Sequence, residues 1–155
     1  MDCLKIEYSD DKINGCMCLD LSFFPCKINT AKKVFDLAVQ WCSDDTIIGF
    51  NNELSKMRDD LENKYTTDCS SFWKIHQIVV ELDEMIDTGK ESNGVPISVI
   101  RMKSIKEQKK KQNSLKRDYK REIKEVKRLI ELLNKNINIL HERIKLKRWG
   151  LYESL

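Results

Sequence analysis

The sequence predicts an α+β fold that is predominantly α-helical. Apolar and polar residues alternate on both sides of Asn14-Gly15, as in a β-hairpin, and apolar residues then recur at helical spacing from Ile28 to Ile86. The segment from Ile97 to Trp149 contains no glycine or proline. We therefore expect an N-terminal β-hairpin packed on three short helices, followed by a long basic C-terminal helix or helical hairpin with coiled-coil character.

The predicted hairpin lies in LKIEYSDDKINGCMCLDLSFF. Asn-Gly favours a type I′ turn, because both central residues of that turn need positive φ. A turn at Asn14-Gly15 pairs Ile13 with Cys16 and places the apolar residues on one face, and a turn at Asp10-Asp11 keeps the same faces. Either hairpin has an apolar face that other elements must cover.

Three amphipathic helices are expected to provide that cover. The first lies in INTAKKVFDLAVQWCSD, and two more follow before residue 88. Their expected N-caps are, in order, Asn29 or Thr30, Asp44 or Asp45, and Asp68 or Ser70. The third helix is expected to carry an apolar stripe of Phe72, Trp73, Ile75, Val79, Leu82 and Ile86.

Residues 88–96, TGKESNGVP, predict a loop, because they hold two glycines and a proline. The following VPISVI fits either a short third strand or a helix start with Pro96 at its first position. The last helix has a polar stretch at 106–118, and Gln112-Asn113-Ser114 is a place where it can bend or break. Both a single long helix and a helical hairpin therefore remain open.

Charge divides the chain more sharply than its net value of +3 indicates. Residues 1–100 carry 10 Lys/Arg and 18 Asp/Glu, whereas residues 101–155 carry 18 Lys/Arg and 7 Asp/Glu. We expect an acidic α+β domain at 1–94 and a basic long-helix segment at 95–155, with a heptad seam at 119–144. The basic segment either docks on the acidic part or is offered to a polyanion.

The heptad seam has apolar residues spaced alternately four and three apart. Its members are Tyr119, Ile123, Val126, Ile130, Leu133, Ile137, Leu140 and Ile144. Isoleucine at a and mostly leucine at d is the pattern of parallel dimers, but Leu129, Leu132 and Ile139 widen the stripe beyond a bare seam. The stripe fits the spine of its own domain, a homodimer contact or a contact with another protein.

A run of lysines and arginines precedes and overlaps the seam. The expected nucleic-acid or partner contacts are Lys109, Lys110, Lys111, Lys116, Arg117, Lys120, Arg121, Lys124 and Arg128. Such a density of cations neutralises phosphates without reading base sequence, although it is also typical of a solvated helix face. The run superficially resembles a basic leucine zipper, but Leu115, Lys116 and Arg117 stand where that family has small residues. We do not assign the family.

Metal and nucleophile patterns point away from an enzyme. Cys3, Cys16, Cys18 and Cys26 lack the paired CxxC spacing of structural zinc sites, and the hairpin register separates Cys16 from Cys3 by about 30 Å at roughly 3.3 Å per residue. The sequence contains two histidines, no Gly-rich phosphate loop and no nucleophile elbow. We expect free thiols, no metal, no cofactor and no catalytic residues.

Composition supplies a hypothesis about origin and role. Lysine outnumbers arginine 21 to 7 and alanine occurs twice, which indicates AT-rich codons. The N-terminus shows no signal core, and no apolar run is long enough to span a membrane, so we expect a cytoplasmic protein, in the host cytoplasm if it is phage-encoded. The leading hypothesis is a non-enzymatic phage or mobile-element inhibitor of host nucleic-acid machinery, of anti-CRISPR type, that occupies a protein or nucleoprotein surface. The alternative is a dimeric DNA-binding regulator or architectural protein that sets its basic helix on phosphate backbone.

Overall fold

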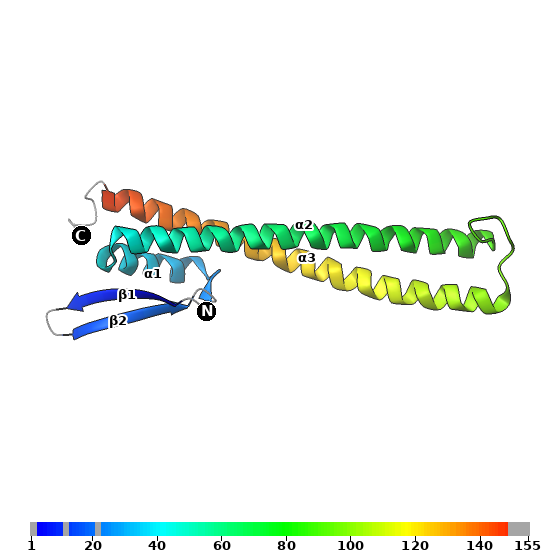
Figure 1. The fold of residues 1–155 in the computed structure, drawn as a ribbon, viewed down its shortest axis with the longest axis horizontal. Helices are drawn as coiled ribbons and strands as arrows, with labels where there is room; N and C mark the ends of the chain where they lie inside the picture. The colour runs from blue at the N-terminus through cyan, green and yellow to red at the C-terminus, as the bar shows by residue number, and fades with distance from the viewer. Residues whose placement is uncertain (1–2, 11–12, 21–22, 149–155) are drawn as a thin grey trace. The chain divides into compact units, whose positions relative to one another are not determined.

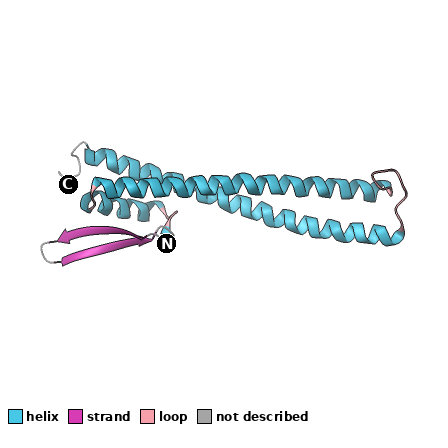
Figure 2. Ribbon diagram, viewed as in Figure 1, coloured by secondary structure: helices cyan, strands magenta, loops and turns pink. Residues whose placement is uncertain are grey.

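Three helices dominate the chain. The computed structural model describes residues 3–10, 13–20 and 23–148, with side chains for 23–40 and 42–148. The helices are α1 (Ile28–Trp41), α2 (Asp44–Thr88) and α3 (Val99–Arg148), of 14, 45 and 50 residues (Figures 1 and 2). Within the described ranges, no helix is both long and apolar enough to cross a bilayer.

The predicted α+β class is wrong, because the fold is all-α. No strand lies among the residues whose side chains are described, and the core is built from the three helices together with Phe24, which precedes α1. The sequence prediction failed because it divided 44–88 into two short helices and relied on the alternating N-terminal segment as a structural layer. Summed helical preference and a helix partner along the whole of α2 outweigh those local signals.

The N-terminal backbone pairs in a register different from the predicted one. β1 (Cys3–Asp10) and β2 (Ile13–Asp20) run antiparallel, with Asp10 opposite Ile13 and Tyr8 opposite Gly15. Asn14 and Gly15 therefore lie inside β2, and the expected turns at Asn14-Gly15 and at Asp10-Asp11 are both wrong. The side chains of this ribbon, including Cys3, Cys16 and Cys18, lie outside the described part.

The ends of the helices differ from the predicted ones. Lys27, which makes no side-chain cap, precedes α1 in place of an Asn29 or Thr30 cap. At the start of α2, Ser43 Oγ accepts a hydrogen bond from the Thr46 N–H at 3.2 Å, so Ser43 is the cap. Asp44 and Asp45 instead occupy the first turn, where their charges favour the positive end of the helix dipole.

The third predicted helix is the second half of α2. Asp68 and Ser70, which were expected to begin it, lie within α2. The Asp68 carboxylate accepts a hydrogen bond from Lys64 Nζ at 2.9 Å, four residues earlier on the same helix. That pair satisfies the carboxylate without a cap, and the helix therefore passes through this position.

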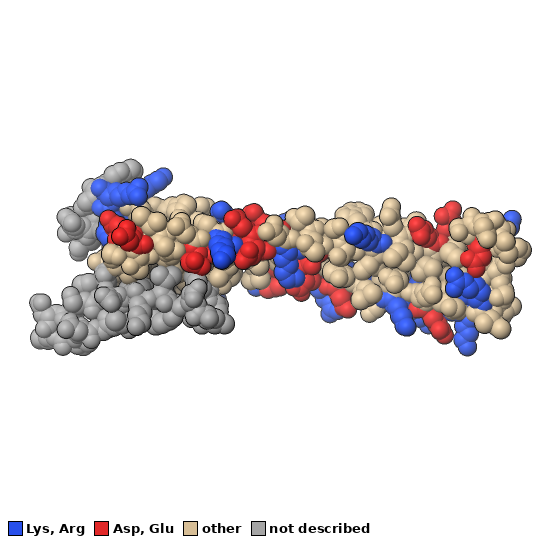
Figure 3. Space-filling view, in the orientation of Figure 1, with Lys and Arg blue, Asp and Glu red and all other residues tan. Residues whose placement is uncertain are grey.

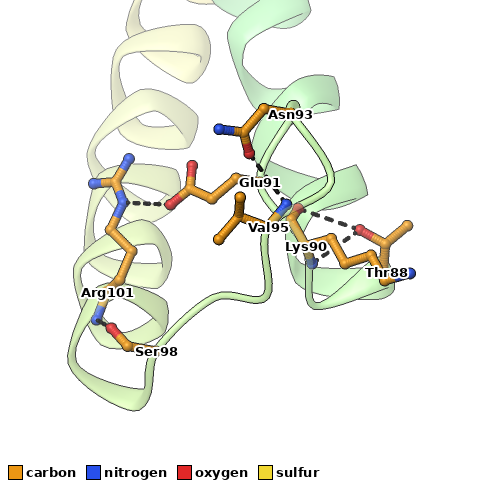
Figure 4. Close-up of polar contacts among 7 residues, drawn as sticks. All are labelled: Thr88, Lys90, Glu91, Asn93, Val95, Ser98 and Arg101. Carbon is orange, nitrogen blue, oxygen red and sulfur yellow. Dashed lines mark hydrogen bonds and ion pairs between the residues drawn. The ribbon is translucent and has the colours of Figure 1, made fainter.

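The connection between α2 and α3 is the loop predicted at 88–96 (Figure 4). Gly89 has a φ of 66°, a left-handed conformation that suits glycine after a helix, and its N–H donates to Met85 O at 2.9 Å. On the other side, Ser98 Oγ accepts a hydrogen bond from the Arg101 N–H at 3.2 Å and caps α3. Pro96 forms an isolated bridge with Lys90, so both predictions for Pro96, a helix start and a strand, are wrong.

α3 is one continuous helix through residues 106–118. The break considered at Gln112-Asn113-Ser114 is therefore not present. With no proline or glycine in α3, nothing in its covalent structure interrupts the backbone hydrogen bonds.

The contacts of the chain define two compact units. Unit 1 comprises residues 1–62 and 128–155, and unit 2 comprises residues 63–127. Both α2 and α3 contribute to each unit. The predicted domain boundary between 94 and 95 stays a prediction, because compactness does not show which part folds independently.

Unit 1 contains the main hydrophobic core. Phe24, Phe35 and Phe50 form an aromatic cluster with ring centroids 5.3 to 5.8 Å apart. Leu54 from α2 and Leu133 from α3 join this core and are fully buried. Three helices thus exclude water from one continuous apolar interior, which is the largest favourable contribution to folding.

Polar contacts fix α3 within unit 1. Asn136, which is fully buried, accepts a hydrogen bond from Cys26 N at 2.9 Å and donates one to Cys26 O at 3.0 Å. Both polar groups of the Asn136 amide are therefore satisfied, as burial requires. Arg143 pairs with Asp36 of α1 at 2.8 Å, so part of the basic segment does dock on the acidic part.

Candidate nucleic-acid or partner interface

Unit 2 is built from the second half of α2 and the first half of α3. Its buried residues are Asp68, Val79, Leu82, Ile105 and Val126. A pair of helices buries only a narrow stripe of each member, and most of the surface of both faces solvent. Unit 2 therefore offers a large exposed area on a limited core.

The seam residues of α3 lie toward the interior of their units. Leu133, Ile137 and Leu140 belong to the core of unit 1, with Ile144 packed against it and Ile130 half-buried. In unit 2, Val126 is buried and Tyr119 and Ile123 are half-buried. These side chains are thus covered within one chain, and a homodimer contact through the seam stays a prediction.

The polar positions that interrupt the seam are also turned inward. Lys109, Gln112 and Lys116 continue the four-and-three spacing and are each half-buried. Lys109 forms an ion pair with Asp83 of α2. Two of the three polar residues in the heptad gap, Lys109 and Lys116, therefore have partners on α2, which the sequence pattern of α3 alone does not reveal.

Lys116 has an aromatic environment. Its Nζ donates a hydrogen bond to His76 Nδ1 at 2.8 Å and lies 5.7 Å from the centre of the Phe72 ring. An ammonium has no acceptor, so His76 must accept through Nδ1 and carry its ring proton on Nε2. The contact with Phe72 is a cation–π interaction.

The nine expected contact residues thus fall into different environments. Lys109 and Lys116 are half-buried and have partners on α2, and Arg121 pairs with Asp118 three residues earlier. Arg128 is exposed and lies in unit 1. The remaining five, which are exposed and pair with no described carboxylate, are Lys110, Lys111, Arg117, Lys120 and Lys124.

Four of those five lie on one side of α3 together with two lysines that the sequence analysis missed. We call this set the cationic ridge: Lys103, Lys106, Lys110, Arg117, Lys120 and Lys124. Their spacings of 3, 4, 7, 3 and 4 residues place them on one helix face. All six are exposed, and none pairs with a carboxylate of the described residues. At about 1.5 Å per residue the ridge extends for roughly 32 Å.

Shallow surface depressions follow the ridge. One is lined by Lys103, Lys106 and Lys110, with apolar side chains at its end. The next is lined by Lys110, Asn113, Lys116, Arg117 and Lys120. The third continues from Arg117 through Lys120 to Lys124. Neighbouring depressions share Lys110, Arg117 or Lys120, so the cations border a series of shallow hollows along α3.

Acidic residues also occur beside the ridge. Glu107 lines the first depression and Asp118 the third. Asp118 pairs with Arg121, and Glu122 pairs with Lys64 of α2. The two carboxylates next to Lys64 raise its pKa, with the hydrogen bond to Asp68 as the larger cause. Figure 3 shows basic and acidic side chains interspersed on the face that it draws. The positive character is therefore a feature of one helix flank and not of the whole unit.

An aromatic cluster on α2 was missed by the sequence analysis. Trp73 was expected on the apolar stripe, but 62% of its surface is exposed. Its ring makes edge-to-face contacts with Phe72 at 5.7 Å and with His76 at 5.5 Å. The sequence WKIHQIVV does not indicate whether Trp73 faces the interior or the solvent, because this stretch places apolar residues on more than one side of the helix.

The described thiols are not arranged for chemistry. Cys26, Cys42 and Cys69 are free, and no cluster of three metal-ligating side chains exists among the described residues. Burial raises the pKa of the Cys26 and Cys42 thiols, and the nearby Lys147 only partly opposes this at Cys42. A raised pKa lowers the thiolate fraction and hence the reactivity of these two residues.

Searches for similar proteins returned no family model, no curated protein and no solved structure that matches this chain.

Proposed function

We propose that the protein is a non-enzymatic binding protein that acts through the cationic ridge on host nucleic-acid machinery. The observation that supports this proposal most is the set of six exposed cations without described carboxylate partners. Burying unpaired charges inside a fold is costly, whereas exposed cations on one helix flank attract an anionic surface and accelerate its association. A nucleoprotein complex, whose nucleic acid carries regularly spaced phosphates, supplies such a surface.

The proposed action is inhibition by occupation, of the kind an anti-CRISPR protein of a phage or mobile element performs. The hairpin of α2 and α3 in unit 2 places a series of cations against the partner. The hairpin then competes with the nucleic acid or protein that normally binds there. Specificity then comes from shape and from the neighbouring side chains, because lysine contacts with phosphate carry no sequence information.

The test is a defence assay in cells that carry an active CRISPR nuclease or another nucleic-acid-targeting defence. Expression of the protein should restore transformation by a targeted plasmid. The variant K110E/R117E/K120E should lose this effect, whereas Lys111→Glu, at an exposed lysine outside the ridge, should retain it. Equal activity of the ridge variant and the wild type would contradict a role for the ridge.

The alternative is a DNA-binding regulator or architectural protein that sets α3 on the phosphate backbone, and the unpaired ridge favours it as well. Salt dependence separates the two hypotheses. A backbone binder should bind random duplex at low salt and lose affinity steeply as salt increases, because bound phosphates release counterions. Failure to bind free duplex at low salt would exclude this alternative.

Dimerisation through the seam stays a separate prediction, which sedimentation analysis tests.

A further inference from the structure

An exposed aromatic side chain of α2, Trp73, is linked through His76 to Lys116, which precedes the ridge residue Arg117. Trp73 contacts His76, His76 accepts a hydrogen bond from Lys116, and Lys116 lines the same depression as Arg117 and Lys120. Two direct contacts thus join Trp73 on α2 to Lys116 on α3, and Lys116 shares a depression with three ridge residues. All of these residues belong to unit 2.

We propose that unit 2 binds single-stranded nucleic acid, with an unpaired base stacked on Trp73 and the backbone phosphates along the cationic ridge. This inference rests on the proposed nucleoprotein partner and names the part of that partner which is contacted. Proteins that bind single strands without sequence preference combine these two features, a positive groove for the backbone and aromatic side chains for the bases.

The geometry of the aromatic cluster suits a stacking platform. Two edge-to-face contacts restrain the Trp73 ring, so little conformational freedom is lost when a base packs on it. Exposing 62% of a tryptophan to water is unfavourable in the free protein, and covering the ring with a base removes that apolar surface from solvent.

Duplex DNA fits the same surface less well. The bases of a duplex are already stacked and paired, so none can reach Trp73 without being unpaired first. The ridge side of α3 presents long lysine and arginine side chains, which keep the helix backbone away from the floor of a groove. A single strand meets neither obstacle, because its bases are free to turn toward α2 while its phosphates follow α3.

Fluorescence anisotropy with labelled dT20, rU20 and a random 20-base-pair duplex tests the proposal on the full-length protein. Both single strands should bind at least tenfold more tightly than the duplex. With six phosphates contacted, the logarithm of affinity should fall with the logarithm of salt with a slope of about −4, a loss of about 250-fold between 50 and 200 mM. A preference between dT20 and rU20 would assign DNA or RNA as the ligand.

Two variants separate stacking from phosphate contact. Trp73→Ala should weaken binding of the single strands by about 5- to 150-fold, the effect of losing one stacked base, with little change in the salt slope. The control Val80→Ala, at an exposed apolar residue of the same helix, should bind as the wild type does. Lys110→Glu should reduce the magnitude of the salt slope by about 1. Lys135→Glu, at an exposed lysine of α3 in unit 1, should leave it unchanged.

The outcomes distinguish this inference from the function that it rests on. If Trp73→Ala binds single strands as tightly as the wild type, or if duplex binds equally well, base stacking is wrong while the ridge still serves a polyanion. If neither nucleic acid binds at low salt but polyglutamate does, the ligand is an acidic protein and the inference is overturned. If polyglutamate alone binds and the ridge variants also lose activity in the defence assay, the proposed inhibition is still supported, with a protein as the ligand.

Discussion

Unit 1 and unit 2 contain parts of the same two long helices but use them differently. In unit 1, α1 packs with α2 and α3, and the three enclose a core with an aromatic centre and the buried amide of Asn136. In unit 2 the third helix is absent, and Trp73, Val99 and Ile100 are exposed, the last two by 88% and 86%. A third helix therefore decides whether apolar side chains of α2 and α3 are covered.

This difference indicates that the two units have different roles, one in stability and the other in presenting side chains. Buried apolar area gives unit 1 most of the stability, since it removes the most carbon surface from water. Unit 2 is a helical hairpin with wide exposed flanks, which is suited to presenting side chains.

Removing the centre of the unit 1 core should have the largest effect. Phe35→Ala should lower the free energy of unfolding by about 3–5 kcal/mol, because it deletes a fully buried ring that packs on two others. Urea denaturation followed by circular dichroism measures the change. Val99→Ala in unit 2 is the matched control and should change stability by less than about 0.5 kcal/mol. Similar losses of unfolding free energy in both variants would contradict the idea that unit 1 supplies most of the stability.

Removing the buried amide should have the next largest effect. Asn136→Ala leaves the backbone N–H and C=O of Cys26 without their partners, at a cost of about 1–3 kcal/mol for each unsatisfied group. The expected result is a lower urea midpoint, whereas Asn138→Ala, at an exposed asparagine two residues away, should leave the midpoint unchanged. If both asparagines tolerate alanine equally, the hydrogen bonds to Cys26 do not stabilise unit 1.

Replacing the half-buried Gln112 by an apolar residue should make the interior of unit 2 more like that of unit 1. The half-buried side chain of Gln112 makes no hydrogen bond with a described residue, and Gln112→Leu should therefore stabilise the α2–α3 contact by about 0.5–1 kcal/mol. Amide hydrogen exchange of unit 2 should slow accordingly. Gln108→Leu, at an exposed position of α3, is the control, and an equal slowing in it would show a general effect of helix preference.

The smallest effect concerns pH. Because burial raises the pKa of the Cys42 thiol above its ordinary value of 9.0, the unfolded chain ionises this group first. The associated stability is fully present below pH 9 and is lost as pH rises through the higher pKa of the folded state. Urea midpoints at pH 8 and 10 should fall more in the wild type than in Cys42→Ala. Equal falls would show that Cys42 does not contribute.

Several features were predictable because their cause is local. The loop at 88–96 follows from its glycines and proline, and the inward face of α3 follows from the four-and-three spacing of residues such as Leu133 and Ile137. The cations of α3 were also identified, although Lys103 and Lys106 were missed. These signals act within a few residues and need no knowledge of the partner helix.

Other features depended on what lies opposite in space. Asp68 was interpreted as a helix cap because aspartate favours that position, but its pair with Lys64 lets α2 continue. Lys109 and Lys116 were expected on the outer surface, yet Asp83 and the Phe72–His76 pair hold them inward. Trp73 was assigned to the stripe, although the narrow contact between two helices leaves it outside.

The sequence was therefore sufficient to predict which face of α3 is apolar and where its positive charge lies, because helix periodicity and charge are properties of neighbouring residues. It left the start and the continuity of α3 open. The tertiary structure was needed to show that the fold is all-α, which lysines lack a carboxylate partner among the described residues and that Trp73 is exposed. Those outcomes depend on contacts between residues far apart in the chain, such as Phe72 and Lys116. No local pattern records such contacts.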